Sequence, residues 1–387
     1  MSMKKIVCIC FVLSLSLTPC FAADWPMFRG DAGNSGASAE TITLPLTEVW
    51  HSSAPAVEEN GAAVANGIVY MMSDVGLLYA FDVATGSAVA GFPVAIGGSF
   101  SAPAVDPVNG KIYALTGSTL YAFNLNGSSA WTATVGGAGA NYNQSPVIDN
   151  GYVYLKAGGN LHKYDSAGTL QWSSPASGGN TQPSIMGGYV YSNSESGSIR
   201  KFDKSTGTEI TVGGFPISTG GSASAVTTIN GRIFHKSDIL YAYSADNGSL
   251  LWSQPDGGNS TYADSPAVSG GFVYVYGWDA RIYAFNEVTG ATLPGFPSVA
   301  LSAGGWGNFG SPVVAGDKIF IGAGTSKKLV VLGAAGSAQA GQVLEEHQLS
   351  SADPQGFDLC SPIVSDGWVF IMLDGGGLYT FIDSRAR

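Results

Sequence analysis

The amino-acid sequence predicts an all-β fold: an eight-bladed β-propeller of four-stranded antiparallel blades, closed by an N-terminal strand that completes the last blade. Three observations support this prediction. A short phrase recurs eight times along the chain, each copy divides into four strand-sized pieces, and the last copy lacks its fourth piece. Periods of about 40–50 residues with several strands each are typical of propeller blades.

The composition agrees with a β-rich fold. The chain has 387 residues, of which 54 are Gly and 12% are charged, about half of the usual ~25%. Many turns and few charged helix-forming residues favour strands over helices. Because 45% of the residues are hydrophobic, the chain can bury a large core, which excludes a disordered protein.

The N-terminus has the pattern of a secretory signal peptide. Lys4 and Lys5 form a positive region, residues 6–17 form an apolar run, and Ala22 and Ala23 offer a cleavage site. The apolar run is shorter than the ~20 residues that a spanning helix needs, so a transmembrane segment is not expected. We therefore expect an exported protein, in the periplasm or outside the cell.

This organisation gives three parts. We expect a signal peptide over 1–23, an N-terminal extension over 24–45 and the propeller over 46–387. A lipid anchor at Cys20 remains a minor alternative.

The net charge and the number of cysteines limit which binding partners and which disulfides are expected. Removing the signal peptide leaves 15 basic and 28 acidic residues, a net charge of −13 that would repel nucleic acid and anionic membranes. Three of the four cysteines lie in the signal peptide, so Cys360 alone remains and an internal disulfide is not expected. We expect a monomer held together by packing, in which Cys360 is a small buried residue.

The recurring phrase consists of a turn pair, a variable residue, Ile or Val, and an aromatic residue. Asn66-Gly67-Ile68-Val69-Tyr70 is a clear copy. The closing aromatic residues are spaced 37 to 50 residues apart. They are Tyr70, Tyr113, Tyr154, Tyr191, Phe234, Tyr274, Phe320 and Phe370.

Each repeat offers four strands. The first begins at a Ser-Pro pair such as Ser145-Pro146, where Pro is tolerated because it starts the strand. An Asn-Gly pair then favours a tight hairpin, since both residues accept positive φ. The third strand shows the alternation Leu-Tyr-Ala-Phe, as at residues 120–123.

The third and fourth strands are joined by a turn of the form Asp82-Val83-Ala84-Thr85-Gly86, in which Asp bonds the turning backbone. The fourth strand often carries a tryptophan. These tryptophans are Trp50, Trp131, Trp172 and Trp252.

Counting strands predicts how the ring closes. The last repeat stops after its third strand, while an orphan fourth-type strand over Leu46–His51 precedes the first repeat. Pairing this strand with Leu378–Phe381 would cover a bare sheet edge.

These motifs resemble the eight-bladed propellers with PQQ-like (quinoprotein-type) repeats, including BamB-like secreted or periplasmic proteins. The segment Asp24-Trp25-Pro26-Met27-Phe28-Arg29-Gly30 is also similar to the start of many secreted members. The resemblance covers residues 24–387 and implies the fold. Because the family mixes quinone-dependent dehydrogenases with non-catalytic binding proteins, it does not decide the activity.

The residues argue against a quinone enzyme. Family dehydrogenases hold the quinone against a vicinal Cys-Cys disulfide, and this chain has no such pair. It also lacks the Cys-x-x-Cys-His haem attachment. We therefore predict no cofactor and no metal, with PQQ and a divalent cation such as Ca²⁺ as the alternative.

Other catalytic motifs are weak. Residues 305–310 match Gly-x-Gly-x-x-Gly as a string, but a helix is not expected after them. His162 replaces an aromatic of the third-strand pattern and is expected to pack. His51 and His347 are expected on the surface, and His235 in a solvated loop.

The functional face is expected where loops vary. The hairpins and the Asp-x-x-Thr-Gly turns are short and fall on one face, whereas connections between blades, and between second and third strands, fall on the other. Such exposed loops on a rigid scaffold commonly bind ligands. The candidate ligand-binding residues are Asn143, His235, Tyr262, Asp264, Trp278, Asp279, Trp306, Asn308 and Asp358.

A mouth lined by aromatic, amide and carboxylate side chains suits a sugar or a peptide. We therefore expect a scaffold that binds a protein partner or a carbohydrate or peptide ligand. The alternative is an enzyme, either the dehydrogenase or a polysaccharide lyase or hydrolase. A lyase would use Tyr262 or His235 as base, with Lys156, Lys236 or Arg281 stabilising the developing charge.

Overall fold

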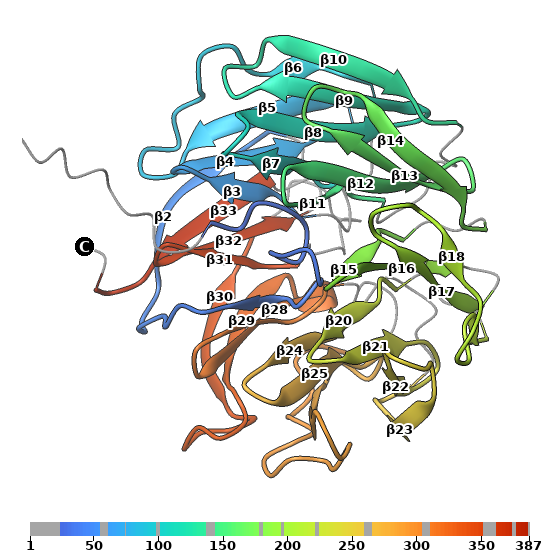
Figure 1. The fold of residues 1–387 in the computed structure, drawn as a ribbon. Helices are drawn as coiled ribbons and strands as arrows, with labels where there is room; N and C mark the ends of the chain where they lie inside the picture. The colour runs from blue at the N-terminus through green and yellow to red at the C-terminus, as the bar shows by residue number, and fades with distance from the viewer. Residues whose placement is uncertain are drawn as a thin grey trace, which may run out of the picture.

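The fold is a ring of eight β-sheets around a central axis, as predicted (Figure 1). It is seen in a computed structural model that describes residues 24–54, 61–73, 75–97, 101–136, 144–177, 181–194, 197–220, 224–258, 265–303, 310–350, 361–373 and 377–385. Each sheet is one blade, with its first strand innermost. Within the described part of the chain, no helix is long and apolar enough to cross a membrane.

Blades 1 to 4 follow one another along the chain. Blade 4 has two short outer strands, and both pair with the third strand of that blade. The strands are β3 (Ala63–Ala65), β4 (Ile68–Met72), β5 (Leu77–Asp82) and β6 (Val94–Ala95); β7 (Ala104–Asp106), β8 (Lys111–Thr116), β9 (Thr119–Asn124) and β10 (Ser129–Thr134); β11 (Val147–Asp149), β12 (Tyr152–Ala157), β13 (Asn160–Asp165) and β14 (Leu170–Pro175); β15 (Ser184–Met186), β16 (Tyr189–Ser194), β17 (Ser198–Asp203), β18 (Glu209–Ile210) and β19 (Ile217–Ser218).

Blades 5 to 8 complete the ring, and blades 7 and 8 each take in one N-terminal strand. A short 3₁₀ turn, η1 (Gly324–Ser326), follows the second strand of blade 7. The strands are β20 (Thr227–Ile229), β21 (Arg232–Lys236), β22 (Leu240–Ser244) and β23 (Leu250–Gln254); β24 (Ala267–Ser269), β25 (Phe272–Tyr276) and β26 (Ile282–Asn286); β1 (Ala37–Ser38), β27 (Val313–Ala315), β28 (Lys318–Ala323), β29 (Lys328–Gly333) and β30 (Val343–Gln348); β2 (Thr47–Ser52), β31 (Ile363–Ser365), β32 (Trp368–Leu373) and β33 (Gly377–Ile382).

The predicted closure is confirmed. Strand β2 pairs antiparallel with β33, with Trp50 opposite Thr380 and His51 opposite Tyr379. The strand spans Thr47–Ser52, one residue later than expected, and its register shifts between Glu48 and Trp50. The N-terminal strand therefore supplies the outer edge of blade 8.

The tight turns lie on one face of the ring. In blade 1, Asn66 and Gly67 both have positive φ (53° and 72°), so the predicted hairpin forms there. The Val83 amide donates to the Gly67 carbonyl at 2.9 Å, which ties the turn between third and fourth strands to this hairpin. We call the face with these hairpins and turns the hairpin face, and the opposite face, with the connections between blades, the loop face.

Tryptophans on fourth strands join neighbouring blades. The Trp131 indole nitrogen donates at 3.0 Å to the carbonyl of Ser166, in the third-to-fourth-strand turn of the next blade. Trp172 and Trp252 make equivalent bonds to Lys204 and Glu287 at 3.2 and 3.1 Å. Each indole thus buries apolar surface between two blades while its polar N–H is satisfied.

Blades 1, 4 and 6 use a different device. A Gly-Phe-Pro sequence interrupts the outer strand, so blade 6 has three described strands followed by a bridge between Phe285 and Thr292. Proline cannot donate to a ladder, which explains the interruption. The phenylalanine packs on the closing aromatic residue of its own blade, with ring centroids 6.0–6.3 Å apart; the pairs are Phe92–Tyr70, Phe215–Tyr191 and Phe296–Tyr274.

Residues 24–41, which we call the central segment, follow the inner rim of the ring. The carbonyls of this segment accept hydrogen bonds from the middle amide of the innermost strand in six blades, at 2.7–3.0 Å. The donors are Val64, Val105, Ile185, Thr228, Val268 and Val314, in blades 1, 2, 4, 5, 6 and 7. In Figure 1 the blue N-terminal ribbon crosses the middle of the ring.

The two remaining blades meet the central segment through side chains. Met27 shares an apolar cluster with Val147 of blade 3. In blade 8, the Glu40 carboxylate accepts from the amides of Asp366 and Gly367, the latter at 2.7 Å. The central segment therefore contacts every blade and covers inner strand edges that would otherwise expose unpaired backbone groups.

Candidate functional site

Three of the nine predicted binding residues lie in the described part of the chain: His235, Trp278 and Asp279. Trp278 and Asp279 lie in the turn between β25 and β26, a second-to-third-strand connection as expected. The other six remain predictions because they fall outside the described residues: Asn143, Tyr262, Asp264, Trp306, Asn308 and Asp358.

Asp279 is held by its own blade. Its carboxylate accepts a 2.8 Å hydrogen bond from the Tyr283 hydroxyl, and the Arg281 guanidinium lies 3.5 Å away. Arg281 in turn donates to the Ser298 carbonyl at 2.7 Å. This network fixes the turn that also carries the half-buried Trp278.

The expectation that His235 lies in a solvated loop was wrong. His235 is part of strand β21, pairs with Tyr241 of β22, and has no exposed surface. The second strand continues past the closing aromatic residue because its ladder with β22 extends to Lys236 and Leu240. The polar pair His235-Lys236 hid this continuation in the sequence.

Burial also changes the chemistry of His235. Desolvation lowers its pKa to about 4, and the nearby Asp238 opposes this shift only in part. Neither ring nitrogen has a hydrogen-bond partner among the described residues. A neutral, fully enclosed imidazole cannot reach a substrate on the surface, so a lyase would depend on Tyr262, which lies outside the described residues.

The other histidines follow the predictions more closely. His162 is buried and stacks on Tyr164 with centroids 6.2 Å apart, which confirms a packing role. His51 is exposed on the outer strand β2. His347 lies on the outer strand β30, is partly buried, and packs 4.7 Å from the ring of Phe381. Cys360 is outside the described residues.

A buried polar layer lies beneath the loop face in blades 3 to 6. The residue two places after the closing aromatic is Lys156, Asn193, Lys236 or Tyr276 in these blades, and each is at most 1% exposed. In blades 1, 2 and 8 the same position holds Met72, Leu115 and Met372. This buried position is therefore polar in blades 3 to 6 and apolar in blades 1, 2 and 8.

Hydrogen bonds link this layer across blades. Lys156 donates its ammonium group to the Asn193 carbonyl, and the Asn193 amide donates to Ser224 at 3.0 Å. The Ser224 hydroxyl then donates to the Lys236 carbonyl at 2.7 Å. Aligning the eight repeats would have revealed this position, because it lies at a fixed distance from each aromatic residue.

The middle of the ring is filled by the central segment. Arg29, 1% exposed, donates to the Pro266 and Pro312 carbonyls at 2.9 and 2.8 Å. Asn34 donates to the carbonyls of Pro183 and Val226. This filling could not be predicted from the sequence, because bonds to backbone carbonyls at strand starts leave no pattern in side chains.

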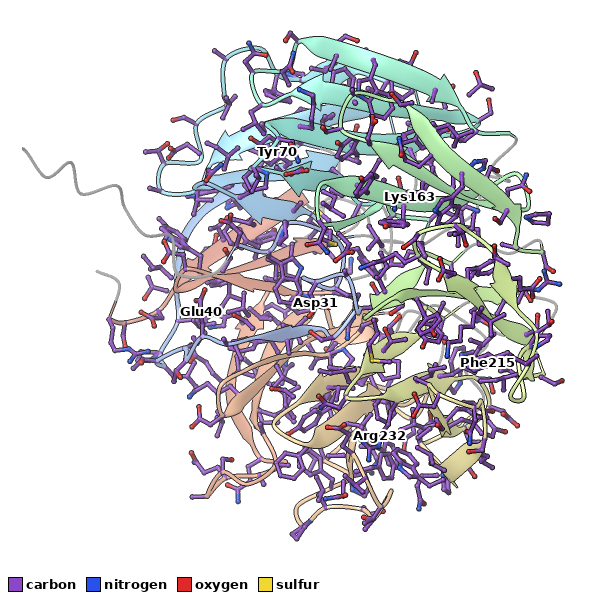
Figure 2. All side chains as sticks on the ribbon, viewed as in Figure 1. Asp31, Glu40, Tyr70, Lys163, Phe215 and Arg232 are labelled. Carbon is purple, nitrogen blue, oxygen red and sulfur yellow. The ribbon has the colours of Figure 1, made fainter. Side chains whose placement is uncertain are left out.

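Figure 2 shows how this filling is arranged: Asp31 lies near the middle of the ring and Glu40 closer to blade 8. The Asp31 carboxylate accepts from the amides of Gly33 and Ser35, at 2.9 and 3.0 Å, and so shapes the tight path between blades 4 and 6.

The serines of the Ser-Pro pairs bond around the channel. The Ser311 hydroxyl accepts from the Ser265 amide at 2.8 Å, and the Ser361 hydroxyl accepts from the Ser311 amide at 3.0 Å. The Ser145 hydroxyl does the same for Ala102 at 2.9 Å. These pairs therefore join consecutive blades, a role beyond starting a strand.

No metal centre is formed in the part of the chain that the structure describes, where no three His, Cys, Asp or Glu side chains gather at ligand distance.

Comparison with known proteins gives one family. The family model described as outer membrane protein assembly factor BamB, a PQQ-repeat model, matches residues 47–155, 116–210 and 211–385. No curated protein matches the chain in sequence.

Several solved structures share the fold. BamB from Moraxella catarrhalis is 16% identical, with a TM-score of 0.67, over 87% of this chain and 100% of that one. Quinohemoprotein alcohol dehydrogenase from Comamonas testosteroni is 15% identical, with a TM-score of 0.69, over 93% and 80%. The computationally designed Ika8 protein is 14% identical, with a TM-score of 0.64, over 87% and 98%. At these identities the likeness concerns the fold alone.

Proposed function

Because this chain belongs to the family of the outer membrane protein assembly factor BamB, we propose that it is an exported, monomeric binding scaffold. It binds a protein partner, or a carbohydrate or peptide ligand, at its loop face, and it carries out no chemistry there. The site lies in the periplasm or outside the cell.

The observation that carries this proposal is the filling of the ring by the central segment. Arg29 and Asn34 bond the carbonyls at the starts of the innermost strands. The segment is also tied to the hairpin residues Asn66, Asp366 and Gly367 through Asp24 and Glu40, so it fills the channel from the hairpin face as far as the strand starts. The loop face is then the side on which a ligand can meet side chains from several blades at once.

The described residues of that face support binding rather than catalysis. Trp278 offers a half-buried indole on a fixed turn, and such rings stack on sugars and on apolar side chains. The carboxylate of Asp279 is engaged by Tyr283 and Arg281. His235, the histidine expected nearest this face, is enclosed in the protein.

The test places a photo-crosslinking amino acid at position 278 and, as a matched control, at position 49. Val49 is 44% exposed on the outer strand β2, and Trp278 is partly exposed, so a crosslinker can be placed at either position. We expect irradiation in the native compartment to link position 278, and not position 49, to one macromolecule identified by mass spectrometry. Equal labelling at both positions would contradict binding at the loop face.

A second measurement separates scaffold from enzyme. Protein purified from its native compartment is examined by absorbance and by mass spectrometry for small molecules. A stoichiometric quinone would overturn the proposal in favour of the dehydrogenase.

A further inference from the structure

The innermost strand of blade 3 is joined to the centre of the ring differently from most of its counterparts. In β11, Ile148 lies opposite Val153 of β12, next to the pair that flanks the turn at residues 150–151. Because pairs in an antiparallel ladder alternate, the amide and the carbonyl of Ile148 point away from β12, toward the axis of the ring. The equivalent amides of six other blades donate to the central segment at 2.7–3.0 Å. Among the described residues, the Ile148 amide has no such acceptor.

A tight turn in the central segment explains the missing bond. The carbonyls of Trp25 and Pro26 accept from the innermost strands of blades 1 and 2, so the Met27 carbonyl is the next in line for blade 3. It accepts instead from the Gly30 amide at 2.9 Å, within its own turn. The φ of Gly30 is 85°, which glycine adopts without strain. The central segment therefore passes blade 3 without bonding the inward amide of β11.

A hollow of about 700 Å³ lies at this edge, between blades 2 and 3 on the hairpin face, and Ile148 is part of its lining. We call it the 2–3 hollow. Ile148 is partly exposed, whereas the middle residue of the innermost strand is buried in the seven other blades. Val364, which holds this position in blade 8, has no exposed surface. Among the eight innermost strands, all of them described, blade 3 is therefore the one whose inward edge a ligand can reach.

Blade 1 shows which chemistry covers such an edge. Trp25 forms an antiparallel bridge with Val64. The Val64 amide donates to the Trp25 carbonyl at 2.8 Å, and the Trp25 amide donates to the Val64 carbonyl at 2.9 Å. Both bonds join main-chain groups, and Ile148 presents the same donor and acceptor toward the axis. The edge in blade 3 therefore fits an extended polypeptide, which adds to a sheet through main-chain bonds.

The lining of the 2–3 hollow favours an apolar segment that is not acidic. Met27 and Val105 contribute apolar surface, and Val108 is 92% exposed. An exposed aliphatic side chain beside an apolar hollow gains from being covered by another apolar group. The charged side chains of the lining are all carboxylates, so an acidic segment would be repelled. They are Asp24, Asp106 and Asp165.

We propose that the 2–3 hollow binds an extended segment of a partner polypeptide, one residue of which forms with Ile148 the two main-chain bonds that Trp25 forms with Val64. Apolar side chains of this segment cover Val105 and Val108. The 2–3 hollow lies on the face opposite the predicted ligand-binding loops, so this proposal goes beyond the loop-face scaffold and does not depend on it.

The first test asks whether the edge is open. The protein of residues 24–387 is labelled with ¹⁵N-isoleucine, and amide hydrogen exchange is followed by NMR, with the Ile148 signal identified by its loss in Ile148→Val. Ile185 is the matched control in blade 4, because its amide donates to the Ala32 carbonyl at 2.7 Å. We expect the Ile148 amide to exchange at least about tenfold faster. Equal exchange would show that another part of the chain already covers the edge, and would overturn the proposal.

The second test adds a peptide. The probe is acetyl-Lys-Trp-Pro-Met-Phe-Lys-amide, whose middle copies residues 25–28, and the control is the same peptide built from D-amino acids, which has equal charge and apolar surface. Binding is measured by isothermal titration calorimetry. We expect the L-peptide to bind at least about tenfold more tightly, because two main-chain bonds require its handedness, and to slow the exchange of the Ile148 amide. Absence of binding at millimolar peptide, equal affinity of the two enantiomers, or unchanged Ile148 exchange would overturn the proposal.

A proline variant removes the inward donor. Ile148→Pro deletes an N–H that the β11–β12 ladder does not use, and proline is accepted at such strand edges. We expect the L-peptide to bind at least about tenfold more weakly, while the melting temperature falls less than in Val105→Pro. The Val105 amide donates to the Pro26 carbonyl at 2.7 Å, so that variant loses a bond of the folded protein. Unchanged peptide affinity in Ile148→Pro would overturn the proposal.

A variant at the exposed Val108 tests the site without touching the strand. Val108→Glu should weaken the L-peptide at least about fivefold, because apolar contact is lost and a buried carboxylate is disfavoured. The control is Val288→Glu, at an exposed valine in a turn of blade 6 that does not line the 2–3 hollow, and it should leave the affinity within about twofold. Equal effects of the two glutamates would place the peptide elsewhere and overturn the proposal.

Discussion

The indole nitrogen of Trp50 donates a 2.8 Å hydrogen bond to the carbonyl of Val83. Trp50 belongs to β2 in blade 8, whereas Val83 belongs to the turn that ends the third strand of blade 1. This bond therefore crosses the place where the ring closes, and it repeats there the contact that Trp131, Trp172 and Trp252 make between other blades.

Replacing Trp50 should weaken this closure. We expect Trp50→Leu to lower the free energy of unfolding by about 2 kcal/mol, because a half-buried indole and its hydrogen bond are lost. Hydrogen exchange should show that the amides of β2 and β33 lose protection first. Trp172→Leu is the matched control at the boundary of blades 3 and 4, and it should leave β2 protected; unchanged β2 exchange in Trp50→Leu would contradict the prediction.

Gly86 is needed for the same contact. Its φ is 69°, and a Cβ there would lie 2.6 Å from the Trp50 ring. We expect Gly86→Ala to cost about 2–3 kcal/mol, from backbone strain and displacement of the indole. Gly110→Ala is the control, since Gly110 has a similar φ of 63° but open space around its Cβ position; it should cost only about 1 kcal/mol in denaturant unfolding. Equal costs would show that the Trp50 contact is unimportant.

Arg29 should contribute strongly to stability from inside the ring. In Arg29→Met, the Pro266 and Pro312 carbonyls lose buried donors, so we expect a loss of about 3 kcal/mol. Limited proteolysis should then cut within residues 24–41. Arg200→Met, at a partly exposed arginine on blade 4, should cost less than about 1 kcal/mol. An Arg29 variant as stable as the Arg200 variant would contradict this role.

His235 makes stability depend on pH. Its pKa is about 4 in the folded protein and about 6.5 when unfolded, so between these values the unfolded chain binds more protons. Stability is therefore full above pH 6.5 and falls as the pH is lowered toward 4, by up to about 3 kcal/mol. The His235→Met variant should lose less stability on acidification. The measurement is the melting temperature from pH 7 to pH 4.

Part of the stability loss on acidification should persist in His235→Met. Burial also lowers the pKa of His162, and this shift acts in the same direction. His51→Gln, at an exposed histidine, serves as the control and should behave like the unmodified protein. An unaltered pH profile in His235→Met would contradict the assignment.

The N-terminal residues should be needed for closure as a whole. A protein lacking residues 24–52 loses the central segment and β2, exposes the edge of β33, and should aggregate or melt far below the complete chain. Removing 24–45 alone separates the two effects, since β2 is kept. A monomeric 53–387 protein with unchanged melting would contradict strand exchange.

The fold was predictable from the sequence because its evidence is repeated. Eight aromatic residues at similar spacing specify the blades, and the missing last strand specifies the partner of Trp50. The central segment was not predictable in the same way. Its contacts run through backbone carbonyls to the amides of β3, β7 and later strands, and such bonds require no particular side chain.

The positions of single residues were harder to predict from the sequence than the strands. His235 was assigned to a loop because two polar residues end the apolar alternation of β21, although the ladder continues beneath them. The role of Ser311 as an acceptor from the neighbouring blade depends on the closeness of two strand starts that lie 46 residues apart. Sequence alone predicts the residue types of the loop face, but not which of them lie close together, because that depends on contacts between blades.

The central segment also sets an order of events during synthesis. Residues 24–41 are made first, but Glu40 cannot bond the amides of Asp366 and Gly367 until more than 320 further residues exist. At about 5–20 residues per second this takes roughly 20–60 s. During that time the Glu40 bonds and the pairing of β2 with β33 are missing, so these contacts, which are distant in sequence, must form last and slowly. A chain that stops before blade 8 keeps an unpaired β2 and an unpaired Glu40 carboxylate, so the ring closes only after its last strands have been made.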